Sequence, residues 1–238
     1  MVTPSLPLNI KGAEVLRRGT RLIGPIDLTL GQTGLTIVLG PNGSGKTSLL
    51  RLMQGLERAA KGSVTWSIPE IDARARRAFV FQTPTMMRRN VIDSIAYSLI
   101  VSGTKRSHAR ERAREMACQV GLEHALARSA RVLSGGEKQK LAVARALIRR
   151  PEVLFLDEPC ANLDGRATRE IETILTDAKA RDTRIVMSTH DLGQAARLAD
   201  EVVFMLKGRV HETGSAEGFF STPATAEAQA FLNGDIVE

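Results

Sequence analysis

The sequence predicts an α/β fold in which a parallel β-sheet is covered by helices on both faces. Short, continuous apolar runs recur along the chain, for example at residues 35–39 and 153–156. Strands that are buried on both faces have this composition, because neither face meets water. Segments with helical character separate the runs, and such alternation is typical of parallel sheets. In addition, 43% of the 238 residues are hydrophobic, which is enough for a full core.

The elements follow one another in order along most of the chain. The run at 35–39 leads into a glycine-rich loop, and a helix is expected from Ser48. Apolar residues at 91–100 recur with a period near 3.6, which predicts a second helix. Further strands are expected at 62–67, 77–81, 153–156, 184–189 and 201–206, and further helices at 106–128, 137–149 and 166–181.

The helical block at about 90–130 interrupts the alternation of strands and helices. A chain of 238 residues has room for one large domain, or for a core domain that carries a smaller subdomain. We therefore expect this block to form the subdomain.

The chain is basic, with a formal net charge of +7 and a pI near 9.9. Nucleic acid, anionic lipid or an acidic protein face would each suit such a surface. Much of the charge lies at residues 105–115, where acids and bases interleave at helical spacing. This pattern predicts a solvated helix face, so the charge alone does not select a partner.

Two further features bear on the cellular setting. No apolar run approaches the roughly 18 residues that span a bilayer, and the N-terminus lacks a signal-peptide pattern. Cys118 and Cys160 are far apart and have no partners at metal-ligand spacing. We expect both to be reduced packing residues in a cytoplasmic protein.

The loop at residues 40–47 matches the pattern Gly-x-x-x-x-Gly-Lys-Thr at every fixed position. Glycines let the backbone fold tightly, so that N–H groups point at the β- and γ-phosphates of a nucleoside triphosphate. Lys46 can neutralise phosphate oxygens, and the Thr47 hydroxyl can bind Mg²⁺. The expected phosphate-binding residues are Gly40, Pro41, Asn42, Gly43, Ser44, Gly45, Lys46, Thr47 and Ser48.

Asp157 and Glu158 directly follow the apolar run at 153–156. They would lie at the carboxyl edge of the sheet, where ligands bind in open α/β folds. Asp157 would hold Mg²⁺, usually through water, and Glu158 would polarise the attacking water. Alone this pattern is weak, because such acids also cap helices. The glycine loop upstream makes it a strong one.

A second phosphate-binding helix terminus is expected where Ser134 precedes two glycines. The segment at residues 133–137, Leu-Ser-Gly-Gly-Glu, resembles the signature sequence of ATP-binding cassette (ABC) proteins. The resemblance implies that this segment caps the γ-phosphate of an ATP held by a second copy, so that two chains enclose two ATP molecules. The implied contact residues are Ser134, Gly135, Gly136 and Glu137.

The resemblance covers about residues 8–215 and includes three further motifs. Gln82 stands where the family has a glutamine that reaches Mg²⁺ and the water. His190 matches a histidine that touches the γ-phosphate, and residues 161–164 resemble a loop that contacts the partner subunit. The remaining histidines, which we expect at the surface, are His108, His124 and His211.

One part of the family pattern is absent. The family usually places an aromatic residue, most often Tyr, roughly 25 residues before the glycine loop, where it stacks on adenine. Residues 14–21 contain no aromatic side chain, although a planar Arg guanidinium could stack there instead. ATP rather than GTP is therefore an expectation from the family.

The resemblance also implies an architecture. It predicts a P-loop NTPase (RecA-like) core with an antiparallel β-subdomain and an inserted α-helical subdomain. Residues 1–238 then form a single ATP-binding domain. In this domain, residues of about 83–145 contain the helical subdomain with the signature, and residues 215–238 form a short C-terminal helical tail.

The leading functional hypothesis is the ATP-hydrolysing subunit of an ABC importer. Its implied cofactors are ATP and Mg²⁺, and its implied partners are a second copy, a membrane permease and, indirectly, a solute-binding protein, with no nucleic acid. Such a subunit lies on the cytoplasmic face of the membrane. The implied catalytic residues are Glu158, His190, Gln82 and Lys46, and the implied metal-binding residues are Thr47, Gln82 and Asp157.

Other functions stay open at this point. Residues 217–223 and 230–235 resemble the ending of compact oxyanion importers, especially those for tungstate, with phosphate or polar amino-acid importers as alternatives. A non-transport ABC ATPase that acts on nucleic acid or the ribosome would carry a long coiled coil or a second cassette. A nucleotide sensor without turnover is disfavoured by Glu158.

Overall fold

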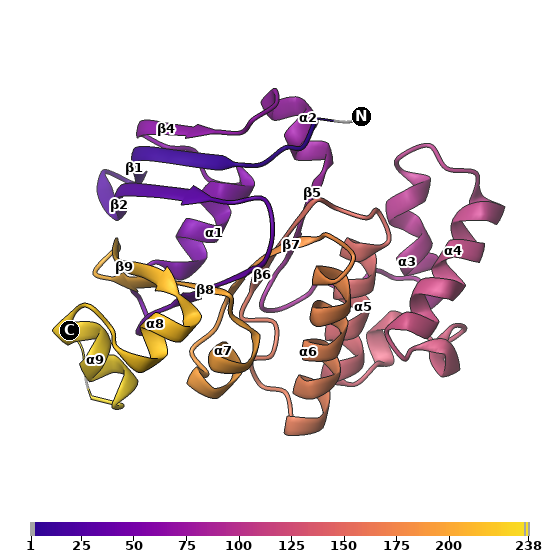
Figure 1. The fold of residues 1–238 in the computed structure, drawn as a ribbon. Helices are drawn as coiled ribbons and strands as arrows, with labels where there is room; N and C mark the ends of the chain where they lie inside the picture. Colours follow the sequence, from indigo (N-terminus) through magenta and orange to yellow (C-terminus); the bar gives the residue numbers. More distant parts are fainter. Residues whose placement is uncertain (1–2, 236, 238) are drawn as a thin grey trace.

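The computed structural model describes residues 3–235 and 237, and it confirms the α/β class (Figure 1). The described residues form a six-stranded sheet of order β5-β6-β7-β3-β8-β9 and a three-stranded sheet of order β2-β1-β4. In Figure 1 the three-stranded sheet lies at the upper left and the helices α3 and α4 lie on the opposite side of the molecule. The predicted domain (1–238) and tail (215–238) include residues 1–2, 236 and 238, which lie outside the described residues.

The six-stranded sheet contains the apolar runs of the sequence. Every residue of β3, β6 and β7 is buried, as expected for strands covered on both faces. The sheet is parallel except at one edge, where β9 runs antiparallel to β8 after a tight turn at Lys207 and Gly208, both with positive φ. The strands are β3 Leu35–Leu39, β5 Arg77–Val80, β6 Val153–Asp157, β7 Arg184–Ser188, β8 Glu201–Leu206 and β9 Arg209–Ser215.

The three-stranded sheet is antiparallel, as the family resemblance implied. It comprises β1 Leu8–Arg17, β2 Thr20–Leu30 and β4 Lys61–Thr65. Register shifts interrupt the pairing of β1 with both of its neighbours. Such irregularities break the alternation of buried and exposed side chains, which explains why periodicity did not indicate β1.

Two apolar cores lie on opposite faces of the six-stranded sheet. One core joins alternate residues of the strands, such as Val38 and Phe155, to α1 and the three-stranded sheet. The other joins Ile37 and Leu154 to the helices from α3 onward. One face is therefore covered partly by the antiparallel sheet that the family resemblance implied, where the alternation of strands and helices by itself had indicated helices. The helices of the core are α1 Lys46–Gln54, α2 Glu70–Ala75, α5 Gly135–Leu147, α6 Gly165–Lys179 and α7 Leu192–Leu198.

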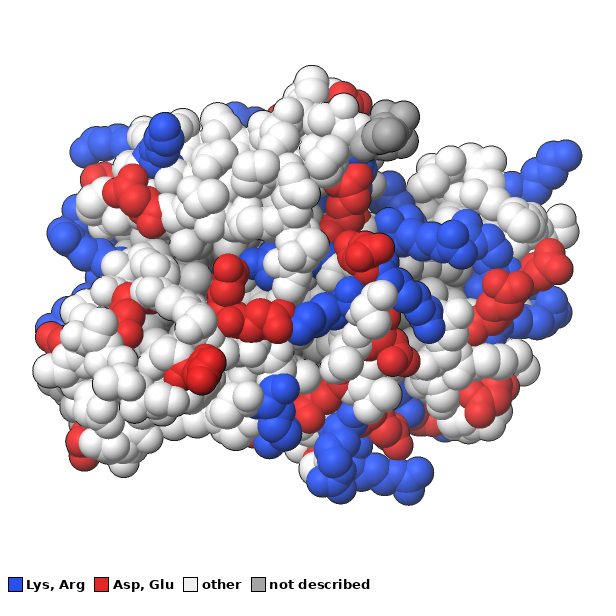
Figure 2. Space-filling view, viewed as in Figure 1, with Lys and Arg blue, Asp and Glu red and all other residues white. Residues whose placement is uncertain are grey.

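The helical block consists of α3 Val91–Ile100, α4 Arg106–Gln119 and two short 3₁₀ turns, η1 Glu123–Ala125 and η2 Ala130–Val132. The expected helix at 106–128 is wrong in its second part, because Gly121 adopts positive φ just beyond the end of α4. Ala109, Ala113 and Ala117 form the buried stripe of α4. Most of its charged side chains are exposed, as predicted, while Arg110 and Arg112 are half-buried. Figure 2 shows acidic and basic side chains intermingled over this block.

The tail of the chain is helical, with α8 Ala216–Ser221 and α9 Ala226–Leu232 packed on β8 and β9. Phe204 of β8 contacts Phe219 and Phe231 of these helices. Cys160 is half-buried against the core as expected, but Cys118 is exposed on α4, so the prediction that it packs inside is wrong. Among the described residues, no helix has both the length and the apolar character needed to cross a membrane.

Candidate nucleotide-binding site

The glycine loop connects β3 to α1 and passes very close to neighbouring strands. Gly40 has a φ of 144°, and a Cβ atom there would lie 2.2 Å from the backbone oxygen of Met205. Gly45 has a φ of 101°, and a Cβ atom there would lie 2.4 Å from Ile23 Cγ2. Only glycine fits both places, because any side chain would displace β8 or β2. The packing of the fold therefore fixes the path of the loop.

Two polar groups inside the loop suit a phosphate ligand. The side chain of Lys46 is only 6% exposed, and its Nζ donates hydrogen bonds to the carbonyls of Gly40 (2.9 Å) and Pro41 (3.1 Å). Burial lowers the pKa of Lys46, while the charges of Glu158 and Asp157 oppose this change. Ser44 Oγ is buried and has no hydrogen-bond partner among the described residues. A buried amine and an unsatisfied hydroxyl at a helix N-terminus fit an anion.

Asp157, the last residue of β6, accepts hydrogen bonds from two hydroxyl groups. Thr47 Oγ1 and Ser188 Oγ each donate a hydrogen bond of 2.9 Å to Asp157 Oδ1. Hydroxyl and carboxylate oxygens are hard ligands, and protein sites usually hold Mg²⁺ through one or two such groups together with substrate phosphates. The described residues contain no group of three or more His, Cys, Asp or Glu that could hold a metal. The Thr47–Asp157 pair thus fits Mg²⁺ that binds with a nucleotide.

Glu158 is the point at which the separate motifs meet. Its Oε2 lies 3.2 Å from His190 Nδ1 and accepts a 3.4 Å hydrogen bond from Gln82 Nε2, and its Oε1 lies 3.9 Å from Lys46 Nζ. The Glu158 side chain is 16% exposed, whereas His190 is 60% exposed. The backbone of Glu158 has a φ of 43°, a conformation that a non-glycine residue adopts only under constraint. The structure therefore brings together four residues that the sequence placed up to 144 positions apart.

Ser188 was not identified from the sequence as a site residue. It is fully buried at the end of β7, and its Oγ both donates to Asp157 and accepts a 3.0 Å hydrogen bond from the backbone N–H of Glu158. One hydroxyl thus orients both carboxylate residues. The signal that could have found it is a serine at the end of a buried strand, two positions before His190.

The signature segment lies at the start of α5, with Ser134 as its N-cap. Ser134 and Glu137 form a capping box in which the Ser134 N–H donates to Glu137 Oε2 (2.8 Å) and the Glu137 N–H donates to Ser134 Oγ (3.3 Å). A Cβ atom on Gly136 would lie 2.9 Å from Ala167 Cβ of α6. Among the described residues, no hydrogen bond or ion pair joins residues 134–137 to residues 40–47. The structure does not bring these two predicted phosphate sites together within one chain.

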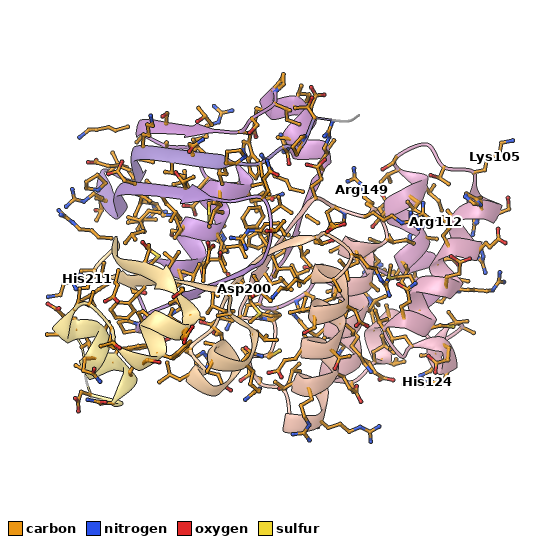
Figure 3. The ribbon with its side chains drawn as sticks, viewed as in Figure 1. Lys105, Arg112, His124, Arg149, Asp200 and His211 are labelled. Atoms are coloured by element: carbon orange, nitrogen blue, oxygen red, sulfur yellow. The ribbon has the colours of Figure 1, made fainter. Side chains whose placement is uncertain are left out.

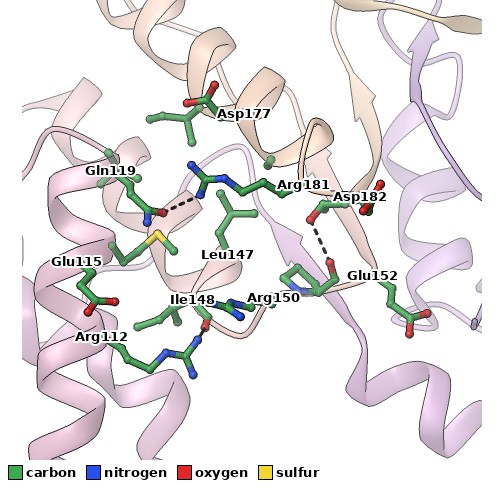
Figure 4. A pocket seen from close by; sticks show the side chains of 16 residues that line it. Arg112, Glu115, Gln119, Leu147, Ile148, Arg150, Glu152, Asp177, Arg181 and Asp182 are labelled. Atoms are coloured by element: carbon green, nitrogen blue, oxygen red, sulfur yellow. Dashed lines mark hydrogen bonds between the residues drawn. The ribbon is translucent and has the colours of Figure 1, made fainter. Parts of the chain in front are cut away.

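A cavity of about 490 Å³ lies elsewhere, between α4 and the ends of α5 and α6 (Figure 4). It is bordered by Glu152 and Thr183, which precede β6 and β7, whereas the glycine loop follows the carboxyl end of β3. Arg112 donates to the Ile148 carbonyl across it. The cavity is therefore at the opposite edge of the sheet from the glycine loop.

The fold and this site define a P-loop protein that binds and hydrolyses a nucleoside triphosphate. The family described as ABC transporter matches residues 23–161, so the chain belongs to this family and is an ABC-type ATPase.

Two curated relatives are 36% identical to the chain. One is the phosphate import ATP-binding protein PstB 2 of Natronomonas pharaonis, for which the match covers 92% of this chain and 84% of the relative. The other is the tungstate uptake system ATP-binding protein TupC of Peptoclostridium acidaminophilum, for which it covers 85% and 94%.

Solved structures show the same fold. The cbiO1 subunit of Clostridium perfringens, part of the ABC transporter complex cbiONQ, matches with a TM-score of 0.82 at 24% identity, over 96% of this chain and 95% of the other. A dimeric ATP-binding cassette bound to ADP and Pi matches with a TM-score of 0.79 at 23% identity, over 88% and 98%.

Proposed function

We propose that the chain is the ATP-hydrolysing subunit of an ABC importer, which drives solute uptake through a separate membrane permease. The observation that carries this proposal is the convergence of Lys46, Gln82 and His190 on Glu158 at the end of β6. Residues 1–238 would form one ATP-binding domain, with the helical subdomain at about 83–145 and a helical tail at 215–238.

The residues at Glu158 suggest how hydrolysis proceeds. Glu158 would accept a proton from the attacking water, and His190 and Gln82 would orient that water toward the γ-phosphate. Lys46 and the loop N–H groups would bind the β- and γ-phosphate oxygens and stabilise the charge that develops on them. Mg²⁺, held by Thr47, Gln82 and Asp157, would supply further charge neutralisation there.

The signature segment supports a dimer. Ser134 and Gly135 are exposed at a helix N-terminus, where an anion binds favourably. Because no hydrogen bond or ion pair within the described residues joins this terminus to the glycine loop of its own chain, we propose that it caps the γ-phosphate bound by a second copy. The contacts would come from Ser134, Gly135, Gly136 and Glu137, and residues 161–164 would face the partner.

Uptake of an oxyanion is the most specific form of the proposal. The relatives named for phosphate and tungstate import match most of their own length, whereas an Fe(3+) import relative of Rhizobium meliloti is matched over only 61% of its length. We favour tungstate, with phosphate as the alternative. A permease, and indirectly a solute-binding protein, would be the partners, and the subunit would lie on the cytoplasmic face of the membrane.

Trapping the ATP-bound state tests the proposal. With ATP and Mg²⁺, Glu158→Gln should bind nucleotide without turnover and elute as a dimer in size-exclusion chromatography with light scattering. ADP should leave it monomeric. A Glu158→Gln variant that binds ATP but stays monomeric would contradict the two-chain site. Co-purification of the wild type with a membrane permease tests the importer assignment.

A further inference from the structure

The first turn of the signature helix is held by one carboxylate, which has a histidine and an arginine as further partners. Besides its two bonds with Ser134, Glu137 Oε1 lies 3.1 Å from His124 Nε2 and accepts a 3.1 Å hydrogen bond from Arg128 Nη1. The Glu137 side chain is 16% exposed, whereas those of His124 and Arg128 are about half exposed (55% and 45%). The carboxylate therefore lies beneath two groups that reach it from the solvent side.

Both partners come from a different segment than α5. His124, labelled in Figure 3, belongs to η1. Arg128 follows it in the loop that leads to η2. The backbone N–H of Ser134 contributes most to lowering the pKa of Glu137 to about 2, and the His124 hydrogen bond and the Arg128 charge act in the same direction. Glu137 is therefore ionised throughout the physiological range.

An ionised Glu137 creates a conflict at this helix start. Its carboxylate orients Ser134 and favours the helix, because negative charge is stabilising at an N-terminus. It would also repel the triphosphate of a second chain that approaches the same helix end. A positive charge bonded to the carboxylate offsets this repulsion and fixes the carboxylate in its capping position.

We propose that Arg128, assisted by His124, is a positioning residue for ATP hydrolysis: it neutralises and orients Glu137, so that the start of α5 can receive the γ-phosphate of a second chain. This inference rests on the proposed two-chain site. Arg128 touches neither phosphate nor water in this arrangement, and it acts through Glu137.

The rate of ATP hydrolysis in variants that lack these charges tests the inference in the full-length protein. Arg128→Gln should lower kcat about tenfold, the effect of losing one charge-assisted hydrogen bond. Binding of a fluorescent ATP analogue to the monomer should stay within about twofold, because the glycine loop is untouched. Arg128→Lys should restore most of the rate. His124→Gln should have a smaller effect in the same direction.

The double variant Arg128→Gln/Glu137→Gln separates neutralisation from folding. If Arg128 is needed because Glu137 is charged, this double variant should regain several-fold of the kcat lost in Arg128→Gln alone. Arg131→Gln is the matched control, since Arg131 is an exposed neighbour for which the structure shows no ion pair within the described residues. Thermal unfolding verifies that each variant folds; where Arg128→Gln does not, His124→Gln and the double variant carry the test.

The outcomes distinguish this inference from the proposed function. Ser134→Arg should abolish turnover if the signature segment completes the site. If Ser134→Arg abolishes turnover but Arg128→Gln keeps at least half of the wild-type kcat, the positioning role of Arg128 is wrong and the two-chain site stands. A defect in Arg128→Gln that Glu137→Gln does not relieve also overturns it. If Ser134→Arg turns over ATP normally, the proposed two-chain site itself fails.

Discussion

The glycine loop and the signature segment would serve the same triphosphate, yet they are built differently. The loop at residues 40–47 lies against β2 and β8, with Lys46 and Ser44 buried. In the signature segment, Ser134 and Gly135 are exposed. The shape of the first is fixed by contacts that leave no room for a Cβ atom, and that of the second by a capping box and the side chains of His124 and Arg128.

This difference shows where each part gets its precision. A loop enclosed by neighbouring strands is preorganised by the fold, so nucleotide binding requires little rearrangement there. An exposed helix end is free to approach another surface and is held largely by local electrostatics. Variants in the loop should therefore affect folding and binding, whereas variants in the signature segment should affect the later assembly of the site.

Glu158→Gln should have the largest effect, because it removes the group on which Lys46, Gln82 and His190 converge. We expect kcat to fall by about 10²–10⁴-fold while ATP binding is retained, the range for loss of a general base. Phosphate release measures the rate. Glu170→Gln, which alters an acid on α6, is the control. More than a tenth of the wild-type rate in Glu158→Gln would place the base elsewhere.

Gly40→Ala should disrupt the loop through packing. Its Cβ would lie 2.2 Å from the Met205 oxygen, at a φ of 144°. We expect a loss of roughly 2–4 kcal/mol in unfolding free energy, from steric overlap and backbone strain combined. Gly43→Ala is the matched case, because it has a φ of 81° but open space around the Cβ, and should cost only about 1 kcal/mol. Urea unfolding compares them, and equal losses would contradict the packing argument.

Ser188→Ala should weaken the link between the two carboxylate residues. The variant removes one of the two acceptors of the Glu158 N–H, which keeps the Ser188 backbone carbonyl at 3.2 Å, and it removes one donor from Asp157. We expect about 1–3 kcal/mol of lost stability, about 0.5–1.5 kcal/mol for each of the two lost hydrogen bonds, together with a lower kcat. Denaturation and phosphate release test this. Ser102→Ala, at an exposed hydroxyl, should change neither, and a Ser188→Ala variant equal to it would refute the role of Ser188.

Glu137→Gln should have a small effect on stability, with a characteristic pH dependence. Folding lowers the pKa of Glu137 from 4.5 to about 2, so its contribution is complete above pH 4.5 and is lost as the pH falls toward 2. We expect the variant to lose about 1–2 kcal/mol at pH 7, after solvent screening. The difference from wild type should shrink between pH 4.5 and pH 3 in urea titrations. A difference that is constant with pH would show that the charge of Glu137 does not stabilise the fold.

The sequence predicted what depends on local chemistry. The glycine pattern at 40–47 requires conformations that few other residues adopt, and the run before Asp157 is apolar enough to be buried on both faces. Lys46, Gln82 and His190 then converge on Glu158 in the structure, whereas residues 134–137 lie apart from the glycine loop. Their catalytic roles stay predictions.

What the sequence did not predict depends on tertiary contacts. The bulges of β1 and the left-handed turn at Gly121 have no simple periodicity. His124 was expected at the surface and is there, but its pairing with Glu137 depends on how η1 packs against α5. The role of Ser188 likewise follows from the adjacent positions of β6 and β7.

Mixing two inactive variants tests the central claim most directly. Lys46→Met should inactivate the glycine loop, and Ser134→Arg the signature segment. In a mixed dimer, the intact loop of one chain faces the intact signature of the other, so one complete site re-forms. About half of randomly assembled dimers are mixed, and an equimolar mixture should recover roughly a quarter of wild-type activity. If the mixture is as inactive as each variant alone, although light scattering shows mixed dimers, the two-chain site is wrong.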